Sequence, residues 1–165
     1  MIEKTLIVLK PDALQRGVTG EIISRFEKIG LKMVAAKIVE PDEEFYYHHY
    51  ENIGKMVSRR GQKAFDFTLA MMQNGPVLAI ILEGVEAVKV VRKMVGTTEP
   101  KEALPGTIRG DFAHTSFAYS DSKNKGTSNL IHASGDIEDA KAEIEHWFKP
   151  EEIYDYSAVH EKHTR

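Results

Sequence analysis

The sequence predicts an α+β fold in which helices pack on one antiparallel sheet. Four runs rich in apolar and β-branched residues are expected to form strands, at residues 5–10, 31–39, 77–82 and 129–134. Segments with apolar residues at helical spacing lie between and after them, at residues 20–29, 45–53, 64–73, 85–95 and 137–148. Without the additional helices this order is βαββαβ, the split-βαβ or ferredoxin-like arrangement, and we expect its helices to cover one face of the sheet.

Turn-forming residues set the bounds of these elements. The first run ends at Pro11, and the second follows Gly30, a natural end for helix 20–29. Asn74-Gly75-Pro76 interrupts the chain before the third strand, which Glu83-Gly84 should end. Helix 85–95 is predicted to turn a valine face inward, made of Val88, Val91 and Val95.

Two segments show no clear periodicity. Residues 55–63 are expected to form a basic, glycine-containing connection. Residues 97–128 are expected to contain little regular structure, and they carry Thr98 and Arg109. A loop of this length inside a compact domain is uncommon and is usually functional.

The composition suits a single domain over residues 1–165, because 42% of the chain is hydrophobic. A formal net charge of -3 argues against nucleic acid as the main partner. The absence of cysteine excludes disulfides and thiolate chemistry. The apolar run at residues 6–9 is too short for a signal peptide, and residues 77–82 fall far below the roughly 20 residues that span a bilayer. We therefore expect a cytoplasmic protein that does not cross a membrane.

His132 is the first candidate for chemistry. It lies in the last predicted strand, where Leu130, His132 and Ser134 should share one face of the sheet. Asp136 follows as the expected N-cap of helix 137–148. A rigid strand is a good support for a reactive side chain. By position alone, however, a single histidine in a strand is more often structural than catalytic.

Three cations are further candidates: Lys10 ends the first strand, Arg92 flanks helix 85–95, and Arg109 precedes Gly110. Each has an ordinary explanation as a solvated surface residue. If they converge, they would form a polyphosphate site without a glycine loop, because arginine matches phosphate oxygens with two parallel hydrogen bonds. Motifs of P-loop enzymes, protein kinases and HExxH zinc enzymes are absent, and the adjacent His48 and His49 are expected at the surface.

Three motifs together resemble those of the nucleoside diphosphate kinase family. They are L-K-P-D-A-L-Q-R-G at residues 9–17, P-G-T-I-R-G-D-F at 105–112 and N-x-x-H-A-S at 129–134. The resemblance runs from Thr5 to about Tyr156 and implies a ferredoxin-like core. It also implies transfer of the γ-phosphoryl group of a nucleoside triphosphate, mainly ATP, to a nucleoside diphosphate. The transfer would be ping-pong, through a phosphohistidine at His132.

The resemblance implies roles for the other site residues. Glu143 would hold the distal imidazole nitrogen of His132, and Ser134 would hydrogen-bond that carboxylate. The expected nucleotide ligands are Lys10, Arg92, Thr98 and Arg109 at the phosphates, Asn129 and Lys10 at the ribose, and a stacking ring at the base. The base position falls at Ala64 or Phe65, and we choose Phe65. Tyr50 would lie near the histidine, and Mg²⁺ would be held mainly by the nucleotide phosphates, with no protein ligand assigned.

The chain departs from the family pattern at three places. Residues 52–63 and 113–128 contain additional residues, and in the second segment Phe117 and Tyr119 could form a wall of the base cleft. Gly135 replaces the family's aspartate. We therefore expect phosphoryl transfer to be retained and the nucleobase preference to differ.

The resemblance also implies self-association. A homohexamer is expected, with a tetramer or dimer as alternatives, and the loop at Pro105-Gly106 matches one that packs between subunits. The competing hypothesis is a catalytically inactive nucleotide-binding or regulatory protein on the same fold. An RNA-binding module is less consistent, because the central strands lack exposed aromatic residues.

Overall fold

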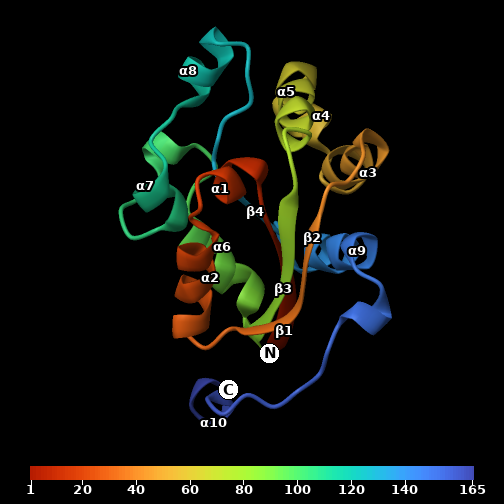
Figure 1. Ribbon diagram of the computed structural model, residues 1–165, viewed down its shortest axis with the longest axis vertical. Coiled ribbons are helices and arrows are strands. Elements are labelled where there is room, and N and C mark those ends of the chain that lie inside the picture. The colour runs from red at the N-terminus through yellow and green to blue at the C-terminus, as the bar shows by residue number, and fades with distance from the viewer.

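Four strands form one antiparallel sheet in the computed structural model, which describes residues 1–165 (Figure 1). The sheet order is β2-β3-β1-β4, and every pairing is antiparallel. The strands are β1 (Ile2–Leu9), β2 (Lys32–Val39), β3 (Val77–Val85) and β4 (Ile131–Ala133). The predicted βαββαβ arrangement is confirmed.

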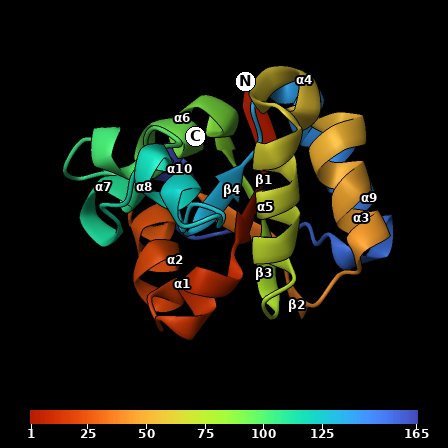
Figure 2. The same cartoon turned by 90° about the horizontal axis from the view of Figure 1, so that it is seen from above.

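Helices occupy the connections and the C-terminal part of the chain (Figure 2). The α-helices are α1 (Pro11–Gln15), α2 (Thr19–Lys28), α3 (Glu43–Tyr47), α4 (Met56–Arg60), α5 (Gln62–Met72), α6 (Ala87–Val95), α7 (Ile108–Phe112), α8 (Phe117–Ser122), α9 (Ile137–Trp147) and α10 (Glu161–Thr164). A π-helical turn η1 (His48–Ile53) and two 3₁₀ turns, η2 (Pro100–Glu102) and η3 (Pro150–Glu152), complete the set. No helix combines the length and the apolar character needed to cross a membrane.

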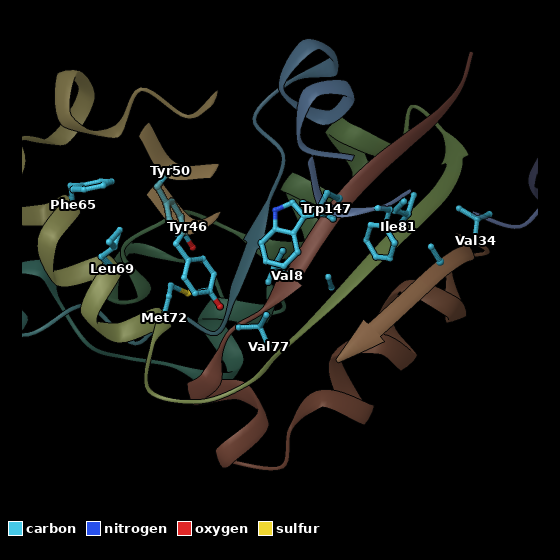
Figure 3. Close-up of a cluster of buried hydrophobic side chains, with 14 residues drawn as sticks. Val8, Val34, Tyr46, Tyr50, Phe65, Leu69, Met72, Val77, Ile81 and Trp147 are labelled. Atoms are coloured by element: carbon cyan, nitrogen blue, oxygen red, sulfur yellow. The ribbon is translucent and has the colours of Figure 1, made fainter. Parts of the chain in front are cut away.

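Both faces of the sheet are covered, so the expectation of helices on one face is wrong. Leu6 and Val8 of β1 belong to a cluster with Trp147 of α9 and the side chains of α3 and α5 (Figure 3). Ile7 and Leu9 point to the opposite face and belong to a second cluster with α2 and α6. A central strand that is apolar at every position can bury both of its faces. The β1 sequence therefore already requires two covering layers.

Two segments expected to be irregular contain short helices. Residues 55–63 contain α4, and Gly61, with a φ of 86°, separates α4 from α5. Residues 97–128 hold η2, α7 and α8. Thr107 accepts a hydrogen bond from the Gly110 N–H, and Ser116 accepts one from the Tyr119 N–H. These side-chain caps stabilise helices too short to show periodicity.

The third strand is longer than predicted. Glu83 and Gly84 do not end β3, because they pair with Lys4 and Glu3 of β1. The strand instead runs to Val85, so the β1–β3 pair forms the long centre of the sheet. β4 is short and pairs with the other edge of β1.

Candidate active site

β4 positions His132 beside β1, where it is opposite Val8. Leu130, just before the strand, has a φ of 70° and is buried in the second cluster with Ile131. The prediction that Leu130 shares the face of His132 is therefore wrong. Left-handed backbone costs a non-glycine residue roughly 1–3 kcal/mol. Two hydrogen bonds keep the Leu130 backbone in this conformation. The Leu130 N–H donates to Asp12 Oδ2 (3.1 Å), and the Leu130 carbonyl accepts from the Lys10 N–H (2.8 Å).

A hydrogen-bonded chain fixes the His132 ring. Its Nε2 lies 2.9 Å from Oε1 of Glu143, a residue of α9 that is only 3% exposed. Ser134 Oγ donates to the other carboxylate oxygen at 2.7 Å and accepts from the Leu6 N–H. Because a carboxylate only accepts, Nε2 carries the proton and Nδ1 keeps its lone pair in the neutral ring. Nδ1 is therefore the ring nitrogen with a lone pair available for nucleophilic attack.

Three cations lie in the same cavity as His132. Lys10 Nζ is 2.7 Å from Asn129 Oδ1, and burial together with the charge of Arg109 lowers the Lys10 pKa to about 7. Arg109 donates Nε to the Asn129 carbonyl (3.1 Å) and an Nη to the Gly96 carbonyl (3.1 Å). Burial and then Arg92 lower the pKa of Arg109 to about 10. The geometry thus concentrates positive charge in a partly desolvated site, which is strongly attractive to anions.

The cavity has a volume of about 570 Å³. It collects nearly every residue predicted for the site, namely Lys10, Tyr50, Arg92, Thr98, Arg109, Asn129, His132 and Glu143. Ser134 does not line the cavity, but it is connected to the site by its hydrogen bond to Glu143. Tyr50 is buried, its ring stands edge-on to His132 at 6.2 Å, and burial raises its pKa. These side chains come from η1, α6, α7, β4 and α9 and from the segments between elements, with Lys10 directly after β1.

Phe65 is not in the cavity, so its prediction as the base-stacking ring is wrong. It is 4% exposed, belongs to the cluster shown in Figure 3 and also packs edge-on against Tyr47. The reason is helical spacing, because Phe65, Leu69 and Met72 form the inward face of α5. The adjoining flank of α5 supplies Ala64, Phe67, Thr68 and Met71 to the cavity.

The wall across from α5 comes from α8. Phe117 lines the cavity, as the sequence suggested, whereas Tyr119 does not and is 53% exposed. Gly126 permits a close approach, since a Cβ there would lie 2.7 Å from the Phe67 carbonyl oxygen. The apolar part of the cavity is thus a slot between two helices, which suits a flat ring.

His49 is a neighbour of His132 that the sequence reasoning missed. It is 1% exposed, and its ring stands edge-on to His132 at 4.5 Å. Trp147 Nε1–H donates to His49 Nδ1 (3.1 Å), so Nε2 carries the proton and has no partner. Burial holds the pKa of His49 well below its ordinary value, so the ring is neutral. The spacing of Tyr46, His49 and Tyr50 along one helical face was the available signal.

One group of side chains could hold a metal ion. One possible ligand atom from each of His49, His132 and Glu143 lies within 4.8 Å of the other two. Two imidazoles and one carboxylate do not suit Mg²⁺, which prefers oxygen ligands in an octahedral arrangement. The donor set therefore offers no resident Mg²⁺ site, and Glu143 is already used by His132 and Ser134.

Comparisons with known proteins agree with this geometry. The family model described as nucleoside diphosphate kinase matches residues 3–153. A nucleoside diphosphate kinase of Borreliella burgdorferi is 46% identical over 94% of this chain and 93% of its own length. One of Pyrococcus furiosus is 46% identical over 94% of this chain and 88% of its own.

Solved structures give the same result. A transition-state mimic of the Borrelia burgdorferi enzyme with bound vanadate and ADP matches with a TM-score of 0.95 and 45% identity, covering 99% of this chain and 96% of that one. An NDP kinase from Pyrobaculum aerophilum matches with a TM-score of 0.84 and 35% identity, covering 94% of this chain and 100% of that one. At 99% coverage, the two additional segments have counterparts in the first structure. The chain belongs to the nucleoside diphosphate kinase family.

Proposed function

We propose that the chain transfers the γ-phosphoryl group of a nucleoside triphosphate, mainly ATP, to a nucleoside diphosphate through a phosphohistidine on His132. As a member of its family, the chain is a phosphotransferase that acts on nucleotides. The observation that carries the assignment of His132 is its hydrogen bond to Glu143, which leaves Nδ1 unprotonated in a cavity lined by cations.

The reaction has two matched steps. In the first, the Nδ1 lone pair attacks the γ-phosphorus, the bond from phosphorus to the bridging oxygen breaks, and the diphosphate leaves with the bond electrons. In the second, a terminal oxygen of another diphosphate attacks the phosphorus and the P–N bond breaks. No proton has to leave Nδ1, and Glu143 stabilises the positive charge that the ring acquires, through Nε2–H. Ser134 orients Glu143.

The cations stabilise the charge on the transferred group. Lys10, Arg92, Thr98 and Arg109 bind phosphate oxygens, and Asn129 with Lys10 binds the ribose hydroxyls. Little covalent chemistry remains for the protein in phosphoryl transfer, so positioning and charge supply most of the rate. Mg²⁺ would be held mainly by the nucleotide phosphates and water, with no protein ligand assigned, and it would neutralise part of the phosphate charge.

The base enters the slot between α5 and α8, against Ala64 and Thr68 on one side and Phe117 on the other. Stacking on one aromatic ring discriminates poorly among bases, so the preference is modest and arises from the residues of α8. A panel of nucleoside diphosphates tests this proposal, and identical kcat/KM values for all bases would contradict it.

One reason to consider an inactive protein was that Gly135 replaces the family's aspartate, and the structure weakens this reason. A Cβ at this position would lie 2.3 Å from Asp139 Oδ2, so the Asp139 carboxylate occupies the space that a side chain at Gly135 would take. Asp139 also lines the cavity. A carboxylate is therefore still available beside His132 and Glu143.

The direct test is steady-state transfer from ATP to GDP. A ping-pong reaction gives parallel double-reciprocal lines at several fixed GDP concentrations, and His132→Gln should abolish turnover. Converging lines, or turnover that survives in His132→Gln, would contradict the mechanism.

We also propose a single domain over residues 1–165, a homohexamer and a cytoplasmic location. The family resemblance at Pro105-Gly106 supports the hexamer, and Leu104 beside it is 73% exposed. Sedimentation velocity tests the assembly; a monomer at micromolar concentration would contradict it. The location stays a prediction.

A further inference from the structure

The slot that we assign to the base has helices α5 and α8 as its two walls, and Figure 1 shows both at the same end of the sheet. The α5 wall carries no charge, because its lining residues are Ala64, Phe67, Thr68 and Met71. The α8 segment differs, since Asp121 and Lys125 also line the cavity. The charged groups that face α5 across the slot are therefore an acid and a base from the additional segment of the chain.

Asp121 lies on the same face of α8 as Phe117. The two residues are four positions apart and both line the cavity, whereas Tyr119 between them does not. Four residues advance about 6 Å along a helix axis, so Asp121 lies beside a ring stacked on Phe117 rather than over it. The carboxylate is thus placed for the edge of a base whose face contacts Phe117.

The backbone holds Lys125 next to Asp121. Asn124 has a φ of 48°, and its N–H donates to the Asp121 carbonyl (3.1 Å). The Lys125 N–H donates to the Ser120 carbonyl (3.1 Å). These two bonds form a Schellman motif, which ends a helix with a defined reversal of the chain. The relative placement of the acid and the base is therefore set by the end of α8 and not by a loose loop.

Both charged side chains are available to a ligand. Neither the Asp121 carboxylate nor the Lys125 ammonium has a hydrogen bond or an ion pair within the chain, and both residues are exposed. Lys125 Nζ lies 5.7 Å from the centre of the Tyr119 ring, a contact that is weak at an exposed site. Gly126 then brings the chain against α5, since a Cβ there would lie 2.7 Å from the Phe67 carbonyl oxygen. The two charges thus lie close to the point where the additional segment meets α5.

We propose that Asp121 and Lys125 bind the Watson–Crick edge of the base and select guanine nucleotides. Guanine presents a carbonyl oxygen, O6, beside two donors, N1–H and the N2 amino group. The Asp121 carboxylate accepts from both donors, and the Lys125 ammonium donates to O6. Each of these hydrogen bonds has one charged partner, which makes it stronger than a bond between neutral groups.

Other bases do not offer this arrangement. Adenine has an amino group in place of O6 and an unprotonated N1, so both charges meet groups of the wrong kind. The pyrimidines do not present two adjacent donors. A site whose polar groups stay unpaired with one ligand discriminates against that ligand. The inference rests on the proposed function in taking this cavity as the nucleotide site, and it adds the base that the site prefers.

Calorimetric titration with GDP, IDP and ADP tests the proposal, because the base of IDP keeps O6 and N1–H of guanine but lacks the amino group. Wild-type protein should bind GDP more tightly than IDP, and IDP more tightly than ADP. Asp121→Asn should raise the Kd for GDP about tenfold, since the charged acceptor is lost, without raising the Kd for ADP.

The Lys125 contact has its own signature. Lys125→Met keeps an apolar side chain of similar length, and it should raise the Kd for GDP and IDP by the same factor but not the Kd for ADP. The matched control is Lys123→Met, which removes the same charge from a side chain 5.9 Å from the Tyr119 ring centre and outside the cavity. It should leave all three Kd values unchanged.

Three results in the variants would overturn the proposal: a guanine preference that survives in Asp121→Asn or in Lys125→Met, ADP affinity that falls as much as GDP affinity in Lys125→Met, or the same change in Lys123→Met. The last two would leave only a general attraction of phosphate. Wild-type protein that binds none of the three nucleotides would overturn both this inference and the proposed function. Wild-type protein that transfers phosphate but binds GDP and ADP equally would overturn the inference alone.

Discussion

Binding of ADP should pull a proton onto Lys10. The free protein holds the Lys10 pKa at about 7, because burial and the charge of Arg109 disfavour the ammonium. A bound diphosphate places negative charge beside the amine and raises its pKa back toward the ordinary value near 10.5. The amine must therefore become charged as the nucleotide binds.

The size of this uptake follows from the pKa. One pH unit above the pKa, at pH 8, about nine-tenths of the free protein has a neutral Lys10, and at pH 6 about one-tenth has. Complete charging in the complex then requires about 0.9 proton per ADP at pH 8 and about 0.1 at pH 6. The phosphates of ADP are themselves ionised at pH 8, so they cannot supply this difference.

Isothermal titration calorimetry in buffers of different ionisation enthalpy measures this number. The slope of the observed enthalpy against the buffer enthalpy is the number of protons taken up. Lys10→Met is the control, in which the uptake at pH 8 should disappear while the fold is retained. An uptake equal at pH 6 and pH 8, or undiminished in Lys10→Met, would refute the assignment of a low pKa to Lys10.

Three further predictions concern stability and rate. Between pH 7 and 10, Lys10 is protonated in the unfolded chain but has lost its proton in the folded chain. The free energy of unfolding should therefore rise with pH, by up to about 1.4 kcal/mol per pH unit. Urea denaturation should show this rise in the wild type but not in Lys10→Met. Phe65→Ala should cost about 3–5 kcal/mol of stability by opening a cavity in the core, yet change the Kd for ADP less than twofold; a large loss of affinity at full stability would return Phe65 to the base site. Ser134→Ala removes the hydroxyl that donates to Glu143. The rate of His132 phosphorylation, measured by stopped flow, should fall by about tenfold. An unchanged rate would show that the Ser134 hydrogen bond is not needed to orient Glu143.

The sequence predicted the number and order of the strands because each contains an apolar run, but it did not predict all of their ends: β3 continues to Val85, and β4 is only Ile131–Ala133. The valine face of the helix that became α6 was also predictable, and Val88, Val91 and Val95 are all buried as expected. What was missed was the second covering layer, although β1 alternates between two apolar faces and so implied it.

The short helices could not be predicted from periodicity. A five-residue helix such as α4 or α7 makes little more than one turn, so no apolar face repeats. Thr107 marks the start of α7 and Ser116 that of α8, whereas α4 has no side-chain cap, and capping residues also occur in loops. Tertiary packing rather than local sequence determines these elements.

The candidate site was predicted unevenly for a physical reason. The motif residues that we propose to bind phosphate keep the spacing of the family motifs, and the structure brings Lys10, Arg109 and Asn129 to one cavity. Phe65 was misplaced because the additional residues before it left its alignment open between two neighbours, and one residue is about 100° around a helix. His49 was overlooked because the adjacent pair was considered only as possible metal ligands, although His49 shares a helical face with the apolar residues Tyr46 and Tyr50.

The most direct test of the central claim is the isolated first step of the reaction. The protein is mixed with γ-labelled ATP and Mg²⁺ without an acceptor, and the label is located by peptide mapping under conditions that preserve phosphohistidine. We predict acid-labile label on His132 that moves to GTP when GDP is added. Nucleotide binding without label on His132, or label that GDP cannot remove, would contradict the proposed mechanism.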